Sequence, residues 1–323
     1  MSNSNQLEMM ERIALDLEGV ERALASSFNT GSEDFNTLIR PLSEAGGKRL
    51  RAQLCLLIAN AGTSVEAERI KIAEAVEMLH LATLIHDDVL DQAEIRRGEE
   101  TIHKHKGNKV AILSGDYLFA KAFRIVSEMP HMEYLKIFSH IITCLVEGEF
   151  MQMEDVYRID QGIDRYMTKT QKKTADFMEG CMELGGLLGG WSSDEIMYLK
   201  RYGHALGMAF QITDDIMDYR ETSDTTGKPV GNDLREGLLT YPLLSIVNES
   251  NQSQLLQDIK NLNHGGNEQE IIDYVIAQGG IDNTLRVAQQ YCDDALSALQ
   301  SIRDFDGKEF LVLAVQNLAD RKV

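Results

Sequence analysis

The feature that most constrains the fold is a helical apolar periodicity that runs through most of the chain. Only four of the 323 residues are proline, and between them apolar residues recur every three to four positions with few alternating β-branched runs. This pattern predicts an all-α fold. The expected helices cover residues 5–28, 32–45, 48–61, 65–92, 108–129, 131–157, 161–190, 194–220, 240–249, 251–262, 267–278 and 280–321, the last with a break near Asp304.

Charge and composition narrow the class of protein. The chain has 51 acidic and 32 basic residues, a formal charge of −19, which argues against a nucleic-acid partner because such a partner requires a basic face. No linker divides the chain, so we expect a single domain over residues 1–323. The start of the chain lacks the pattern of a signal peptide, and no window approaches 18 uninterrupted apolar residues. We therefore expect a cytoplasmic protein without a membrane span.

The cysteines also favour a cytoplasmic protein. None lies in a CxxC motif, and each falls in an apolar stretch that predicts a core position in a reducing compartment. They are Cys55, Cys144, Cys181 and Cys292.

One acidic pattern appears twice, each time at the end of an apolar helical stretch. The aspartates are Asp87, Asp88 and Asp91 in HLATLIHDDVLD and Asp214, Asp215 and Asp218 in FQITDDIMD. On a helix, positions i and i+4 share a face and i+1 lies beside them, so the three charges crowd together. Carboxylates without other donors favour hard cations, and Mg²⁺ typically binds one or two carboxylates together with phosphates. The pattern predicts a magnesium site next to a phosphate group.

The segment before the first cluster supports an internal site. Residues 65–92 are apolar nearly all round, as expected for the central buried helix of a bundle. We expect its aspartates to line an internal cavity.

Basic residues are grouped near these clusters rather than scattered. The groups are Lys48, Arg49 and Arg51 in AGGKRLRA, Arg96 and Arg97 after the first cluster, Lys169, Lys172 and Lys173 followed by Thr174, and Lys228 after the second cluster. Guanidinium and ammonium groups beside Mg²⁺ would bind a diphosphate and stabilise it as a leaving group. A second basic group could hold a second diphosphate.

Taken in order, these motifs resemble those of the all-trans polyprenyl (isoprenyl) diphosphate synthase family, medium/long-chain type. The matching motifs are GGKRLR at 46–51, His80, DDVLD at 87–91, RRG at 96–98, GD at 115–116, GE at 148–149, KTA at 173–175, FQITDDIMD at 210–218, GKPVGNDLREG at 227–237 and Arg321. One departure is Leu238, where the family often has lysine.

The resemblance implies an isoprenoid-synthase-type helical bundle around a deep central cavity. It also implies an Mg²⁺-dependent head-to-tail condensation of isopentenyl diphosphate with an allylic diphosphate, farnesyl or geranylgeranyl, with three Mg²⁺ per active site. A homodimer is expected, and a heterodimer with a small regulatory subunit remains open.

The resemblance also assigns roles to residues. Asp87, Asp88, Asp91, Asp214 and Asp218 would bind metal, and Asp87, Asp88, Asp91, Asp214, Asp215 and Lys173 would be catalytic. Arg96, Lys173, Thr174, Gln211 and Lys228 would hold the allylic diphosphate, and Lys48, Arg51, His80 and Arg97 would hold isopentenyl diphosphate.

Product length depends on residues four and five positions before Asp87, where aromatics in the family block the growing chain. Here they are Thr83 and Ala82, about 6–8 Å along the helix from Asp87. Their small size predicts a product of roughly C30 to C50, with C35 the best guess, because the tail can pass them. Such a product would serve as a quinone side chain and pass to the membrane. A short-chain farnesyl or geranylgeranyl diphosphate synthase is the alternative.

Two remote alternatives remain. A di-iron carboxylate oxidase would use two ExxH motifs, of which Glu77–His80 is one, but Pro130 disrupts the only obvious second copy at Glu128–His131. A non-catalytic subunit of a heterodimeric synthase would lack the aspartate motifs, and this chain has both.

Overall fold

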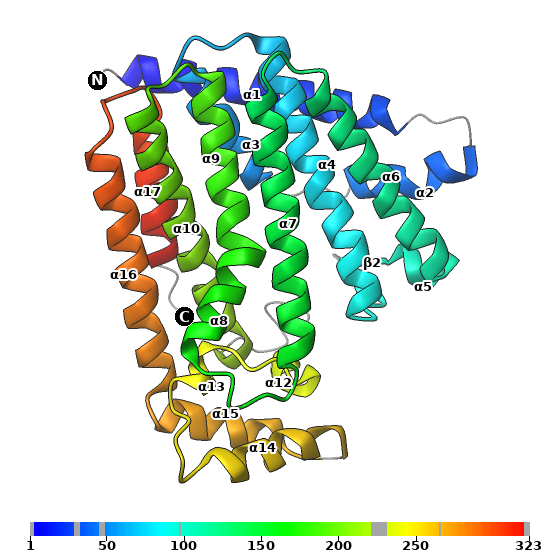
Figure 1. Ribbon diagram of the computed structural model, residues 1–323, viewed down its shortest axis with the longest axis vertical. Coiled ribbons are helices and arrows are strands. Elements are labelled where there is room, and N and C mark those ends of the chain that lie inside the picture. Colours follow the sequence, from blue (N-terminus) through cyan, green and yellow to red (C-terminus); the bar gives the residue numbers. More distant parts are fainter. Residues whose placement is uncertain are drawn as a thin grey trace. The chain divides into compact units, whose positions relative to one another are not determined.

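Helices make up nearly all of the regular structure in a computed structural model of the protein (Figure 1), which confirms the all-α prediction. The structure describes residues 3–28, 33–44, 49–96, 98–220, 231–264 and 266–319. The chain divides into two compact units. Unit 1 comprises Met1–Ser139, Gly180–Met197 and Asp304–Gly307, and unit 2 comprises His140–Glu179, Tyr198–Arg303 and Lys308–Val323.

The first half of the chain contains long helices and one hairpin. The elements are α1 (Asn3–Ser27), α2 (Glu33–Glu44), α3 (Leu50–Asn60), α4 (Glu66–Leu90), β1 (Ile95–Arg96), β2 (Glu99–Glu100), α5 (Ile102–Lys106), α6 (Asn108–Ser127) and α7 (Met132–Asp155).

Helix α4 is the buried centre of unit 1. Every residue from Ile72 to Leu79 is buried, and α4 packs against α1, α3 and α6 (Figure 1). Gly115 allows α6 to approach closely, because a Cβ there would lie 2.1 Å from Nε2 of His86 on α4. The prediction that residues 65–92 form a central buried helix is confirmed.

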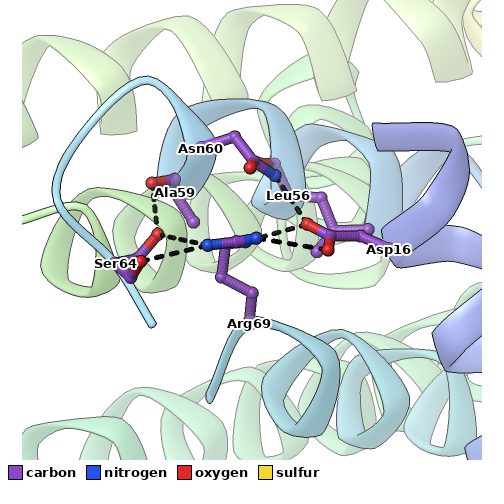
Figure 2. A network of polar contacts seen from close by, with 6 residues as sticks. All are labelled: Asp16, Leu56, Ala59, Asn60, Ser64 and Arg69. Carbon is purple, nitrogen blue, oxygen red and sulfur yellow. Dashed lines mark hydrogen bonds and ion pairs between the residues drawn. The ribbon is translucent and has the colours of Figure 1, made fainter. Parts of the chain in front are cut away.

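A buried ion pair ties α1, α3 and α4 together (Figure 2). Arg69, in the first turn of α4, donates from Nε and Nη2 to Oδ2 and Oδ1 of Asp16 at 2.8 and 3.2 Å. Asn60 donates from Nδ2 to Oδ2 of Asp16 at 2.7 Å, and Arg69 also donates to the carbonyl and hydroxyl oxygens of Ser64. The Asp16 carboxylate therefore compensates the guanidinium in the interior.

The second half of the chain continues with helices of varied length. The elements are α8 (Ile163–Thr170), a π-helical turn (Gln171–Ala175), α9 (Asp176–Leu188), α10 (Ser193–Arg220), α12 (Asn232–Glu236), α13 (Tyr241–Leu244), α14 (Gln252–Asn261), a 3₁₀ turn (Leu262–His264), α15 (Glu268–Ala277), α16 (Gly280–Gln300) and α17 (Lys308–Ala319).

Unit 2 has its own apolar core, to which α8, α10, α13, α15 and α16 contribute. Helix α16 buries Ile281, Ala288 and Cys292 along one face, as its sequence periodicity requires. All four cysteines are free and buried, which confirms their predicted core positions. Among the described residues, none of the helices has both the length and the apolar character needed to cross a bilayer.

The segment predicted as helix over 161–190 is helical from Ile163 to Leu188 and includes the π-helical turn. Other predictions were wrong. The short helices α5 and α12 were missed because five residues are too few to show a periodicity. The helix predicted over 240–249 ends at Leu244. There the Asn248 side chain accepts from the backbone N–H of Ser250, and Asn251 donates to the carbonyl of Ile246, so side chains replace helical hydrogen bonds.

Replacing Asp16 with alanine should lower the free energy of unfolding by about 3–5 kcal/mol, because it leaves the Arg69 guanidinium buried without its carboxylate. Urea denaturation followed by circular dichroism measures the change. Glu8→Ala is the control, since the Glu8–Arg12 pair is about 60% exposed and should contribute less than about 1 kcal/mol. Equal effects of the two substitutions would contradict the assignment.

Candidate active site

The first aspartate cluster lies at the C-terminal end of α4. Asp87 is half-buried, Asp88 is 5% exposed and Asp91, which caps the helix, is exposed. Carboxylates at this end of a helix are unfavourable because the helix dipole is negative there. A cation at this end would therefore stabilise the cluster.

The hairpin after α4 brings a cation to this cluster. Strands β1 and β2 pair Ile95 with Glu100 and Arg96 with Glu99, and Gly98 takes the positive φ of 85° that the tight turn needs. As a result, Arg96 donates from Nε to Oδ1 of Asp88 at 2.5 Å. The structure thus unites two predicted site residues, with Arg96 bound to the buried aspartate.

The residues below the cluster on α4 include the predicted chain-length positions. Ala82 is fully buried, and Thr83 is half-buried with its hydroxyl donating to the carbonyl of His80 at 2.7 Å. His80 is half-buried and lies seven residues, about two turns, before Asp87, hence on the same face. The two positions four and five residues before Asp87, just over one turn along α4, therefore carry small side chains.

The start of α3 holds two arginines with different surroundings. Arg49 has a left-handed backbone with φ 43°, and its guanidinium donates to Glu21 at 2.8 Å and to the buried Glu77 at 3.2 Å. Arg51 is half-buried, and burial lowers its pKa. Glu77 also accepts from the backbone N–H of Ala52 at 3.2 Å. Glu77 therefore anchors the start of α3, which disfavours the di-iron alternative that needs it as a ligand.

The second aspartate cluster lies at the C-terminal end of α10, whose start carries a capping box formed by Ser192 and Glu195. Asp214 is exposed, Asp215 is 5% exposed and Asp218 is half-buried. In both clusters the middle aspartate is thus the buried one.

A chain of hydrogen bonds holds Asp215. Tyr166 on α8 donates to Oδ2 of Asp215, and Gln211 donates to Oδ1 at 3.0 Å. Thr174 in turn donates to Oε1 of Gln211 at 3.0 Å. Burial raises the pKa of Asp215 to about 7, against the effect of these two donors. Within unit 2 the predicted residues Thr174, Gln211 and Asp215 therefore lie together.

The π-helical turn Gln171–Ala175 carries the predicted Lys173 and Thr174. A Cβ on Gly207 of α10 would lie 2.6 Å from Cα of Ala175, and a Cβ on Gly148 of α7 would lie 2.7 Å from Cγ of Lys173. Lys173 pairs with Glu149 at 2.5 Å. The GE motif at 148–149 therefore has a structural explanation, because Gly148 leaves room for the turn and Glu149 pairs with Lys173. π-helical turns within helices are often found at functional sites.

Asp218 has a structural contact in addition to its predicted role. Its carboxylate accepts from the backbone N–H groups of Asn232 and Asp233 at 3.0 and 3.2 Å, and so caps α12. Its role as a metal ligand stays a prediction.

Three predicted site residues, Lys48, Arg97 and Lys228, lie outside the described residues, as does Arg321. Tyr166 and Lys169 had no predicted role in the site. Lys169 is 7% exposed, and burial lowers its pKa while Asp155 and Asp215 raise it. The only feature of the sequence that pointed to Lys169 was its membership of the basic group with Lys172 and Lys173, and nothing in the sequence predicted that it is buried.

The donor set fits a hard divalent cation. All six aspartates offer oxygen alone, and because burial raises the pKa of Asp215 to about 7, a nearby cation would favour its ionised form. In each cluster the less buried aspartates stay the predicted metal ligands, Asp87 and Asp91 at the end of α4 and Asp214 and Asp218 on α10.

Comparison with known proteins agrees with this geometry. The polyprenyl synthetase family model matches residues 32–278. The chain is 32% identical over 312 residues to octaprenyl diphosphate synthase of Escherichia coli, covering 95% of this chain and 96% of that protein. It is 32% identical over 288 residues to heptaprenyl diphosphate synthase component 2 of Geobacillus stearothermophilus, covering 89% and 90%.

A solved structure agrees as well. The polyprenyl synthase of Caulobacter crescentus, complexed with calcium and isoprenyl diphosphate, matches with a TM-score of 0.87 and 30% identity, covering 100% of this chain and 98% of that chain. These features define a helical prenyltransferase of the isoprenyl synthase class. The chain belongs to the polyprenyl synthetase family and is a polyprenyl diphosphate synthase.

Tyr166→Phe should lower the free energy of unfolding by about 1.5–3 kcal/mol at about pH 8, because it removes a donor from the largely ionised Asp215. Tyr202→Phe is the matched control, since that buried hydroxyl donates to the neutral carbonyl of Leu311 at 2.9 Å and should contribute about 0.5–1.5 kcal/mol. Urea denaturation compares the two variants. A smaller effect at Tyr166 than at Tyr202 would show that the contact with Asp215 contributes little.

Proposed function

We propose that the protein condenses isopentenyl diphosphate head to tail with farnesyl or geranylgeranyl diphosphate, giving an all-trans product of roughly C30 to C50. The observation that carries the proposal is the matched pair of clusters. The same DDxxD pattern ends α4 and α10, and in each cluster a buried aspartate has a cationic side chain nearby, Arg96 or Lys169. The named relatives, octaprenyl and heptaprenyl diphosphate synthases, support the long product.

In this proposal both clusters bind metal ions that act on the allylic diphosphate, and the chain is a single catalytic domain. Three Mg²⁺ ions would neutralise the negative charge that develops on the departing diphosphate. Lys173, Thr174 and Gln211, together with Arg96 and Lys228, hold the phosphate oxygens. Lys48, Arg51, His80 and Arg97 bind isopentenyl diphosphate.

The chemistry needs no protein nucleophile. The allylic C–O bond breaks with its electron pair leaving on the diphosphate. The double bond of isopentenyl diphosphate then forms the new C–C bond to the allylic cation. A proton leaves the resulting cation, with released pyrophosphate as its acceptor. The side chains bind, orient and exclude water from the cation.

We also propose where the reaction takes place and how its product is used. A cytoplasmic enzyme would release a product whose apolar tail partitions into the membrane, where it would serve as a quinone side chain. A farnesyl or geranylgeranyl diphosphate synthase is the alternative, and product length separates the two.

Incubation with farnesyl diphosphate, labelled isopentenyl diphosphate and Mg²⁺ should give EDTA-sensitive polyprenyl diphosphates, measured by chromatography. Asp87→Asn and Asp214→Asn should each lower kcat by at least about 100-fold, because each weakens charge stabilisation at the leaving group. Glu100→Gln, on the exposed strand β2, is the control and should keep full activity. Activity that persists in EDTA or in either asparagine variant would refute the proposed metal site.

Ala82→Phe should shorten the product to about C15–C20, because in this proposal the growing tail passes this position, about 8 Å along α4 from Asp87, and an aromatic ring would block it. Ala82→Ser is the matched control and should leave product length unchanged. Thin-layer chromatography of the dephosphorylated products gives the lengths. A wild-type product that already stops at C20, or an unchanged length in Ala82→Phe, would contradict the proposal.

A ridge on α7 supports the proposed homodimer. Val146, Phe150 and Met153 lie at i, i+4 and i+7 on one helix face and are 49%, 61% and 57% exposed. Exposed apolar side chains grouped in this way mark association surfaces. The relative named component 2 keeps a heterodimer with a small regulatory subunit as the alternative.

Phe150→Asp should convert the dimer to a monomer, because it places a charge in the apolar ridge. Light scattering after size exclusion measures the mass. Leu313→Asp, at a 48% exposed position on α17, is the control and should remain dimeric. A wild-type chain that is monomeric and active only with a second component would favour the heterodimer.

A further inference from the structure

A second group of potential metal ligands lies in unit 2, with a different donor chemistry from the aspartate clusters. His140 and Cys144 are four residues apart on α7 and so lie on one helix face. Asp176, the first residue of α9, completes the group. One ligand atom from each of the three residues lies within 4.8 Å of the other two.

The distances already approach those of a coordinated metal. The Sγ of Cys144 lies 3.8 Å from Nδ1 and 3.7 Å from Nε2 of His140. Two ligands held tetrahedrally by Zn²⁺, with bonds of about 2.1 Å to nitrogen and 2.3 Å to sulfur, are about 3.6 Å apart. Small side-chain rotations would therefore close the site without moving either helix.

Burial and access also suit a metal site. Cys144 is 4% exposed and Asp176 is 8% exposed, whereas His140 is exposed and gives the site an entry from solvent. Gln171 donates to Asp176 at 3.3 Å, which is a long hydrogen bond from a neutral group and leaves the carboxylate charge in place.

The surrounding charges favour a cation. Lys172 pairs with Glu147 at 2.6 Å, and Lys200 lies 3.5 Å from Glu179. Each of these two ammonium groups has its own carboxylate, and Asp176 adds a third carboxylate, which accepts a hydrogen bond from the neutral Gln171. Burial, and then the hydrogen bond to Asp176, raise the pKa of Cys144 to about 12. The thiol is therefore unreactive by itself, whereas a bound metal ion would displace its proton.

We propose that His140, Cys144 and Asp176 form a binding site for Zn²⁺ or a similar borderline-soft divalent ion, with water in the fourth position. A thiolate and an imidazole select zinc over magnesium, which prefers oxygen donors alone. The site is independent of the proposed diphosphate chemistry. Its distinguishing property is the sulfur ligand, which the aspartate clusters lack.

A neighbouring triad, Asp176, Glu179 and His204, is the competing location. There Lys200 lies 3.5 Å from one Glu179 oxygen and His204 lies 3.5 Å from the other, so cationic or potentially cationic groups already neutralise that carboxylate. This triad also lacks a thiol. The first triad is therefore the stronger site.

Cobalt spectroscopy of the full-length, tag-free, chelator-treated protein tests the proposal. Co²⁺ should produce a near-ultraviolet thiolate charge-transfer band and intense visible bands of tetrahedral geometry, and Zn²⁺ should displace it. Cys144→Ser should abolish the charge-transfer band, and His140→Gln and Asp176→Asn should each weaken Co²⁺ binding by at least about 10-fold.

Two controls make the outcome decisive. Cys292→Ser removes another buried cysteine, and His204→Gln removes a ligand of the competing triad; both variants should bind Co²⁺ like the unmodified protein. Thermal melting without metal checks that each variant folds. A missing charge-transfer band in the unmodified protein, a band that persists in Cys144→Ser, or a 10-fold loss confined to His204→Gln would overturn the assignment.

Discussion

The constraint on which the structure depends is the placement of carboxylates at the negative ends of two long, largely buried helices. Helix dipoles and burial both raise the free energy of ionised aspartates there. The protein compensates the buried member of each cluster differently. Asp88 accepts from Arg96, which the β-hairpin brings back, whereas Asp215 accepts from Tyr166 and Gln211. The less buried aspartates, at i and i+4 of each cluster, stay the predicted metal ligands.

In both units, glycines allow a neighbouring helix or turn to approach closely. Gly115 allows α6 to approach α4 in unit 1, and Gly148 and Gly207 leave room for the π-helical turn in unit 2. Any side chain at Gly207 would displace the backbone of Ala175, which adjoins Lys173 and Thr174. Gly148 and Gly207 therefore control where the turn that carries Lys173 and Thr174 lies.

Much of the fold could be predicted from the sequence because helical periodicity is a local property. The buried course of α4 and the core positions of all four cysteines were predicted correctly. The errors occurred where local side-chain hydrogen bonds override periodicity, as at Asn248, or where a helix is too short to show it, as at α12. Motifs predicted the residues of the site, but Tyr166 lies in no motif. Only its hydrogen bond to Asp215 in the structure shows that it belongs there.

The sequence alone determined the all-α class and the two aspartate clusters, because spacing along a helix decides which side chains share a face. Its ordered motifs also resemble those of the family to which the chain belongs. Tertiary structure alone decided which member of each cluster is buried, which cation or donor it meets and which glycines admit a neighbouring helix. It also brought Asp176 to His140 and Cys144 across more than thirty residues of sequence. These properties depend on contacts between segments that are distant in the chain, and a pattern read along one helix carries no information about the partner that will pack against it.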